Sequence, residues 1–188
     1  DNPEQEHYWT TDDLPASEDD PVETVIHLAG ENVADGRWSA VKKKQILMSR
    51  VRGTRDLVDY FTTQNKKPRL LLCASAVGYY GNRGDEILDE KSRSGDGFLA
   101  EVCRQWEDES QKISSLGVRV VNLRFGMVLS PKGGALHKML PAFKAGAGGK
   151  IGNGKQYISW ISIRDLVAMV HFIIDNQTIE GPVNIVSP

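Results

Sequence analysis

The sequence predicts an α/β fold in which a parallel sheet carries helices on both faces. Three short apolar runs, 22–28, 70–75 and 118–123, alternate with longer segments in which apolar residues have helical spacing. This alternation is typical of β-α-β units. Turn residues such as Ala29 and Gly30 mark the ends of these runs. A short run that is apolar throughout indicates a strand buried on both faces.

The remaining elements follow in order from caps, apolar spacing and turn residues. Ser39 is a residue type that caps helix N-termini, and apolar spacings of three and four from Leu47 to Phe61 predict a long helix. Similar spacing from Phe98 to Ile113 predicts a second helix. The other predicted elements are a polar loop at 81–97, helices at 135–145 and 164–176, a glycine-rich loop at 146–155, extended segments at 157–163 and 183–186, and an acidic surface loop at 1–22 with a short element at Tyr8 and Trp9.

Composition and charge exclude several classes of function. The 188 residues suit one domain, and a net charge of −2 argues against a nucleic-acid-binding protein. No apolar run approaches the ~18 residues of a membrane helix and no signal-peptide pattern opens the sequence, so we expect a cytoplasmic or organelle-matrix protein that is not secreted. Two cysteines, Cys73 and Cys103, are too few for a disulfide framework or a four-ligand zinc site. We therefore predict no metal, nucleic-acid or membrane partner.

Several residues and motifs are expected to be structural. Cys73 and His27 lie in apolar runs, which predicts a core thiol and a hydrogen-bonded packing histidine; His171 lies in an apolar helix pattern, which also predicts burial. The segment 149–156 resembles a phosphate-binding loop, but Gln156 follows the lysine where such a loop needs Ser or Thr.

Seven ordered blocks indicate a more specific relationship. They read VIHLAGEN (25–32), RWS (37–39), SRVRGT (49–54), ASAVGYYG (74–81), FLAEVC with WE (98–107), LRFGMVL (123–129) and WISIRDL (160–166). Together they resemble the NAD(P)-binding epimerase family, an atypical branch of the short-chain dehydrogenase/reductase proteins related to nucleoside-diphosphate-sugar epimerases. The resemblance runs from about Val22 to the end of the chain. It implies a Rossmann-like parallel sheet that binds NAD(P), with the start of a small C-terminal substrate region.

The resemblance also sets an expectation for domain organisation. The family's first β-α-β unit places the cofactor pyrophosphate on a helix N-terminus, and no counterpart of that unit precedes Val22. We expect 1–188 to form a partial NAD(P)-binding domain, with 131–163 and the C-terminal end contributing to the substrate region. A chain that lacks the first unit is expected to hold the cofactor poorly.

The resemblance implies roles for residues near the strand ends. Cofactor-binding roles fall on Leu28, Ala29, Gly30, Ser75, Arg124, Phe125 and Gly126. Ser75 and Tyr80 are the implied catalytic residues, with Ala76 as the alternative to Ser75. The residues implied to face the substrate are Glu31, Asn32, Trp38 and Trp160.

The catalytic pair of typical members, Tyr-x-x-x-Lys, is absent at its expected place. In that pair the lysine cation lowers the pKa of the tyrosine, so that the phenol can exchange a proton as hydride moves. The tyrosine position holds Phe98 or Leu99, and the lysine position holds Val102 or Cys103. Arg50 stands where typical members carry asparagine.

These features support two main functions. The first is a NAD(P)-dependent oxidoreductase or epimerase acting on an unknown small molecule, such as a nucleotide-sugar or a carbonyl compound. The alternative is a non-catalytic NADP(H)-binding regulatory or scaffold protein, because some relatives are labelled cell-division inhibitors. A third hypothesis is a lyase or dehydratase in which Glu86 or Glu90 acts as a base with a pKa raised by burial. We expect NADP(H) rather than NAD(H) as the cofactor, and a homodimer as the assembly.

Overall fold

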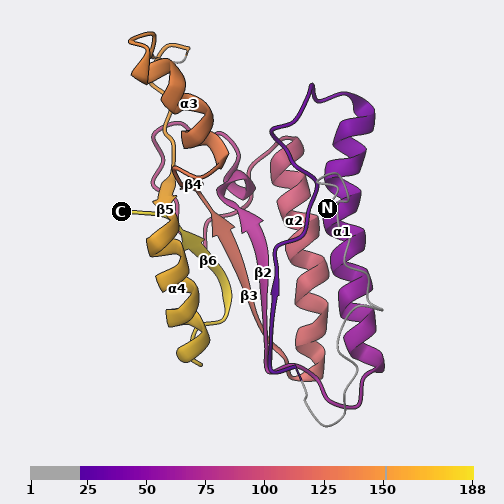
Figure 1. Cartoon of the computed structure of the whole chain (residues 1–188). Helices are drawn as coiled ribbons and strands as arrows, with labels where there is room; N and C mark the ends of the chain where they lie inside the picture. The colour runs from indigo at the N-terminus through magenta and orange to yellow at the C-terminus, as the bar shows by residue number, and fades with distance from the viewer. Residues whose placement is uncertain (1–21, 151) are drawn as a thin grey trace, which may run out of the picture.

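The computed structural model describes residues 22–150 and 152–188, so the short element expected at Tyr8 and Trp9 lies outside the described residues. Four parallel strands form the main sheet in the order β1-β2-β3-β6 (Figure 1). They are β1 (Thr24–His27), β2 (Leu70–Ala76), β3 (Arg119–Phe125) and β6 (Gly181–Ile185). The predicted α/β class, with a parallel sheet between helices, is confirmed.

Helices cover both faces of this sheet. The long helices α1 (Ala40–Thr63) and α2 (Phe98–Gln111) pack side by side on one face, and α4 (Ile163–Asp175) lies on the other (Figure 1). Side chains alternate between the faces of a strand. Accordingly, Leu71 and Cys73 of β2 join the core under α1 and α2, whereas Leu70 and Leu72 join the core under α4.

A smaller unit extends from the carboxyl edge of the main sheet. The strands β4 (Met127–Leu129) and β5 (Trp160–Ser162) pair in parallel, and α3 (Gly134–Lys144) projects beyond them (Figure 1). Two short 3₁₀ helices complete the described elements, η2 (Val77–Tyr80) after β2 and η3 (Lys112–Leu116) after α2.

Local hydrogen bonds explain where two helices begin. The Ser39 hydroxyl accepts from the backbone N–H of Lys42 at 3.2 Å, which confirms Ser39 as the cap of α1. The Ser162 hydroxyl accepts from the backbone N–H of Asp165 at 3.1 Å and caps α4 in the same way.

The predictions for Cys73 and His27 are confirmed, and the prediction for His171 is wrong. Cys73 is fully buried, and burial raises the pKa of its thiol to about 12. His27 Nε2 lies 3.0 Å from the hydroxyl oxygen of Thr54, and burial lowers the pKa of the imidazole. His171 is exposed, because α4 carries apolar residues on its outward side too: Phe172 is 62% exposed. The apolar pattern of α4 therefore could not indicate which side faces the core.

The partly buried His27 makes the free energy of unfolding depend on pH. A histidine whose pKa is lower in the folded protein than in the unfolded chain contributes stability above about pH 6.5, and this contribution is lost as the pH falls through the folded pKa. We expect the free energy of unfolding of the parent protein to fall toward that of His27→Gln between pH 7 and pH 5. Urea unfolding at several pH values measures this difference, with the exposed His171→Gln as the control variant. A difference that stays constant with pH would contradict the assignment.

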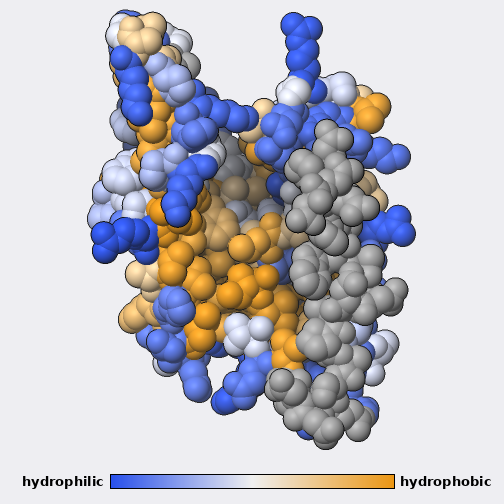
Figure 2. All heavy atoms as spheres, viewed as in Figure 1, coloured by the Kyte–Doolittle hydropathy of each residue, from blue (hydrophilic) through white to orange (hydrophobic). Residues whose placement is uncertain are grey.

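One face of the molecule is unusually apolar. Figure 2 shows apolar side chains gathered over the sheet between α4 and β1. The exposed apolar residues of these two elements include Ile26 of β1, which is 46% exposed, and Val167 of α4, which is 47% exposed. Within the described part of the chain, none of the helices has the length and apolar character needed to cross a bilayer.

Candidate functional site

The carboxyl ends of the parallel strands bring together residues that are far apart in the sequence. The strand register places Ser75 of β2 beside Arg124 of β3, and Arg124 beside Asn184 of β6. Ligands of open α/β sheets bind outside this edge. The strand ends therefore define the candidate site.

Arg124 is the centre of a buried ionic network at this edge. It is 2% exposed and forms a two-pronged ion pair with Glu107 of α2, with Nε–Oε1 at 2.9 Å and Nη2–Oε2 at 2.8 Å. Although burial opposes it, the hydrogen bonds to Glu107 hold the pKa of Arg124 above its ordinary value. The Ser75 hydroxyl donates to Glu107 Oε1 at 2.6 Å, so the only proton of Ser75 points to this carboxylate.

Tyr80 belongs to the same network. Its hydroxyl accepts from Arg124 Nη1 at 3.0 Å and donates to Asn184 Oδ1 at 2.7 Å. The Arg124 guanidinium also lies over the Tyr79 ring, 3.5 Å from its centroid. Burial raises the pKa of Tyr80, and the contact with Arg124 only partly opposes this shift. The phenol therefore stays protonated at neutral pH.

The two residues implied to be catalytic are thus joined through Arg124 and Glu107. Each hydroxyl directs its proton to a protein acceptor rather than to an open cleft. Ala76, the alternative to Ser75, is partly buried and carries no polar group. Sequence reasoning missed the role of Glu107, although one signal was present: Glu107 lies four residues after the buried Cys103, on the same face of α2.

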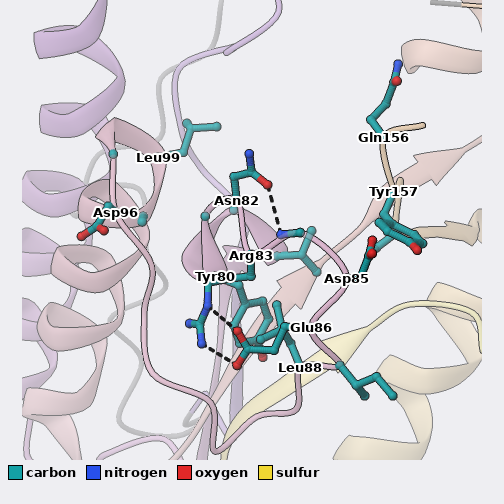
Figure 3. Close-up of a pocket in the computed structure, with 18 of the residues that line it drawn as sticks. Tyr80, Asn82, Arg83, Asp85, Glu86, Leu88, Asp96, Leu99, Gln156 and Tyr157 are labelled. Carbon is teal, nitrogen blue, oxygen red and sulfur yellow. Dashed lines mark hydrogen bonds and ion pairs between the residues drawn. The ribbon is translucent and has the colours of Figure 1, made fainter. Parts of the chain in front are cut away.

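An open cleft of about 1120 Å³ borders this network (Figure 3). Its walls come from η2, the loop 81–97, the N-terminus of α2, the segment 153–159 and β6. Trp38 and Phe98 form part of the lining, and their rings meet edge to face with centroids 5.7 Å apart. The Trp38 indole N–H donates to the backbone oxygen of Val33 at 2.8 Å, which fixes the ring. Tyr157 lies on the opposite side of the cleft from Leu99 (Figure 3).

The acids of loop 81–97 are held by specific partners. Arg83 and Glu86 form a two-pronged pair, at 2.8 Å and 2.6 Å (Figure 3). Glu90 Oε1 accepts from the backbone N–H of Asn184 at 2.9 Å, and its backbone oxygen accepts from Arg124 at 3.3 Å. Both carboxylates suggested as lyase bases therefore already accept hydrogen bonds from protein donors.

Of the residues implied to face the substrate, only Trp38 is part of the cleft lining. Glu31 pairs with Lys42 at 2.5 Å, and its backbone N–H donates to the Ser49 hydroxyl at 3.0 Å. Asn32 bonds within its own turn, to Asp35 and to the backbone N–H of Ala34. Trp160 lies on β5 and is 45% exposed, next to the lining residue Ser159.

The end of β1 is exposed. Leu28, Ala29 and Gly30 are accessible there, and an added Cβ at Gly30 would lie 2.9 Å from Arg50 Cζ. The small residues Ala29 and Gly30 beside a cation leave room for a ligand to approach the backbone closely. The residues at the β3 end differ. Arg124 is buried, Phe125 is partly buried, and Gly126 is required by packing, because an added Cβ would lie 2.8 Å from the backbone oxygen of Ser159.

Within 22–150 and 152–188, no group of three or more His, Cys, Asp and Glu side chains is arranged to hold a metal ion.

Comparison with known proteins agrees with this geometry. The family model described as "NAD dependent epimerase/dehydratase family" matches residues 11–186. The epimerase family protein Mb2239 of Mycobacterium bovis is 42% identical over 167 residues, which cover 89% of this chain and 55% of the relative. The chain therefore spans about half the length of the curated relatives it matches.

Two solved structures extend the comparison. The crystal structure of the human epimerase family protein SDR39U1 (isoform2) with NADPH has a TM-score of 0.85 and 32% identity, and covers 96% of this chain and 62% of that one. The nucleoside-diphosphate sugar epimerase of Corynebacterium glutamicum has a TM-score of 0.77 and 39% identity, and covers 96% of this chain and 38% of that one. The fold is the Rossmann-like α/β fold of these epimerase family structures. More narrowly, the chain belongs to the NAD dependent epimerase/dehydratase family.

Proposed function

We propose that this chain carries the nicotinamide-binding side of a NADP(H)-dependent oxidoreductase or epimerase, whose small-molecule substrate occupies the cleft. The supporting observation is the path of the chain after β1. It leaves the exposed residues 28–30, which fit the cofactor, and reaches Trp38 in the cleft wall within a few residues. The preference for NADP(H) is supported by the human relative, whose structure contains NADPH.

Each part of the site has a role in this function. The bound nicotinamide would supply or accept a hydride. Residues 28–30 would bind it, and Trp38, Phe98 and Tyr157 would hold the substrate and exclude water. Tyr80, whose side chain borders the cleft, is the candidate proton donor; to act, its hydroxyl must exchange its bond with Asn184 for one with the substrate. Ser75 remains a candidate only if its hydroxyl leaves Glu107.

A second function is favoured by a specific observation. The hydroxyl protons of Ser75 and Tyr80 are both directed to protein acceptors, and residues 98–103 lack the tyrosine and lysine of typical members. A non-catalytic NADP(H)-binding protein with a regulatory or scaffold role needs neither group. In that case the cofactor would change a contact with a protein partner, in the cytoplasm or an organelle matrix and as a homodimer.

The two functions are separated by one experiment on the full-length protein. Titration with NADPH and NADH, followed by nicotinamide fluorescence, measures cofactor binding. The protein loaded with oxidised or reduced cofactor is then mixed with panels of nucleotide-sugars and carbonyl compounds. Absorbance at the nicotinamide band reports net hydride transfer, and chromatography of the panel compounds reports epimerisation, which leaves the cofactor unchanged. Conversion by either measure that Tyr80→Phe abolishes supports the enzyme. Tight NADPH binding without conversion of any panel compound supports the regulatory protein, and failure to bind either cofactor contradicts both functions.

A further inference from the structure

We propose that Arg50 binds the nicotinamide half of the cofactor, through hydrogen bonds from its guanidinium to the ribose hydroxyls. The inference rests on the proposed function, because it requires NADP(H) at the end of β1. It assigns a cofactor contact to a residue of α1 that stands where typical family members carry asparagine.

The position of the Arg50 guanidinium supports this role. It reaches from α1 to the exposed end of β1 and lies flat against Gly30, where an added Cβ would be 2.9 Å from Cζ and 3.2 Å from both Nη atoms. The guanidinium also lies over the Trp106 ring, with Cζ 5.0 Å from the ring centroid. A planar cation in contact with both a backbone and an aromatic ring is restricted in orientation. Its free edge is therefore preorganised beside the residues that fit the cofactor.

The hydrogen-bond count of Arg50 indicates that this edge is available. A guanidinium has five N–H donors. Arg50 Nη1 donates to the backbone oxygens of Glu31 and Ile46, at 3.0 Å and 3.1 Å, and these bonds use two donors. Among residues 22–150 and 152–188, Nε and Nη2 of Arg50 have no hydrogen-bond partner, and Arg50 forms no ion pair. Arg119, by contrast, uses both Nη atoms on backbone oxygens, of Ile173 in the last turn of α4 and of Ile179 after it.

The electrostatics of the site point the same way. Burial lowers the pKa of Arg50, and the charges of Cys103 and Glu31 oppose this shift only in part, so the burial of this cation costs free energy. Arg50 lies close enough to Cys103 to oppose the rise that burial causes in the pKa of that thiol. Cys103 is one of the two residues at the lysine position of typical members. Arg50 therefore brings a cation from α1 close to this position.

A purely structural role for Arg50 is the competing explanation, since its bond to the Glu31 oxygen also fastens the loop after β1 to α1. The two roles differ in which half of the cofactor they affect. A ribose contact next to the nicotinamide weakens NADPH and NADH equally and leaves the adenosine fragment 2′,5′-ADP unaffected. A collapsed loop or a damaged fold weakens every ligand.

The test uses the full-length protein and three variants. Arg50→Gln removes the cation, Arg50→Lys keeps the charge without the planar fork, and Arg52→Gln is the matched control, because Arg52 lies on the same helix with its side chain 74% exposed. We expect Arg50→Gln to weaken NADPH and NADH binding about 10- to 100-fold, as for a lost charged hydrogen bond, with Arg50→Lys intermediate and Arg52→Gln unchanged. Binding of 2′,5′-ADP, measured by calorimetry, should change less than about twofold.

Three results would overturn the inference. One is an unchanged NADPH affinity in Arg50→Gln. Another is a parallel loss of NADPH and 2′,5′-ADP binding in both Arg50 variants, and the third is the same loss in Arg52→Gln. If the parent protein binds no nicotinamide cofactor, the proposed function itself fails. If the parent binds NADPH and Arg50→Gln binds it equally well, only the role of Arg50 is refuted.

Discussion

Replacing Glu107 with alanine should lower the free energy of unfolding by about 3–5 kcal/mol, because it leaves the Arg124 cation buried without its partner. The side chains of Arg124 and Glu107 are only 3% and 11% exposed, and they are joined by two hydrogen bonds. Ser75 would lose its acceptor at the same time. Urea unfolding measures the loss, and a folded but destabilised variant should show a lower midpoint at an unchanged slope.

The same helix offers a matched control. Glu101 and Arg104 form an ion pair on the surface of α2, with both side chains more than 40% exposed. Pairs of this kind contribute about 0–1 kcal/mol, so Glu101→Ala should lie near the parent protein. The double variant Glu107→Leu with Arg124→Met removes both charges and should recover most of the stability. If Glu107→Ala and Glu101→Ala lowered the free energy of unfolding equally, the buried pair would contribute no more to stability than the exposed pair.

Gly95→Ala should displace the loop that forms one wall of the cleft. A Cβ at this position would lie 2.0 Å from the backbone oxygen of Tyr80, a distance that no side-chain rotation can relieve. Overpacking of this kind costs about 1–3 kcal/mol or more. The hydrogen bond from the Gly95 N–H to the Tyr79 oxygen, at 3.0 Å, should weaken, and faster amide exchange over 81–97 would report it.

Gly53→Ala is the control for this substitution. Gly53 lies inside α1 with no atom near an added Cβ, so alanine should raise stability by about 0.5–1 kcal/mol. If Gly95→Ala proved as harmless as Gly53→Ala, the close approach of loop 81–97 to Tyr80 would not be real.

Most of the fold could be predicted because its signals are local. An apolar run such as Leu70–Ala76 is buried on both faces whatever surrounds it, and Ser39 caps α1 through a bond to a residue only three positions away. The site, in contrast, depends on contacts between residues that are far apart in the sequence. Whether Ser75 turns toward a cleft or toward Glu107 is decided by how α2 packs on β2, and no periodicity encodes that packing.

The role of Arg50 was hidden for the same reason. The residues around Arg50 in the sequence form an ordinary helix. The role proposed for Arg50 depends on contacts of its guanidinium with Gly30, 20 residues earlier, and Trp106, 56 residues later. For Glu31 the sequence suggested a ligand contact, and the structure shows protein partners. A polar residue after a strand end suggests a ligand contact, but here Lys42 and Ser49 bind it from the adjacent helix.

The network around Arg124 couples the cleft to the stability of the whole domain, which gives a way to identify the substrate. One guanidinium and its partners connect β2, β3, β6, α2 and the loop 81–97, so the cleft wall shares its hydrogen bonds with the centre of the sheet. A compound that binds the cleft should then raise the melting temperature of the whole domain instead of stiffening one loop. Thermal-shift screening of metabolite libraries on the NADPH-loaded protein should therefore reveal ligands before any reaction is known.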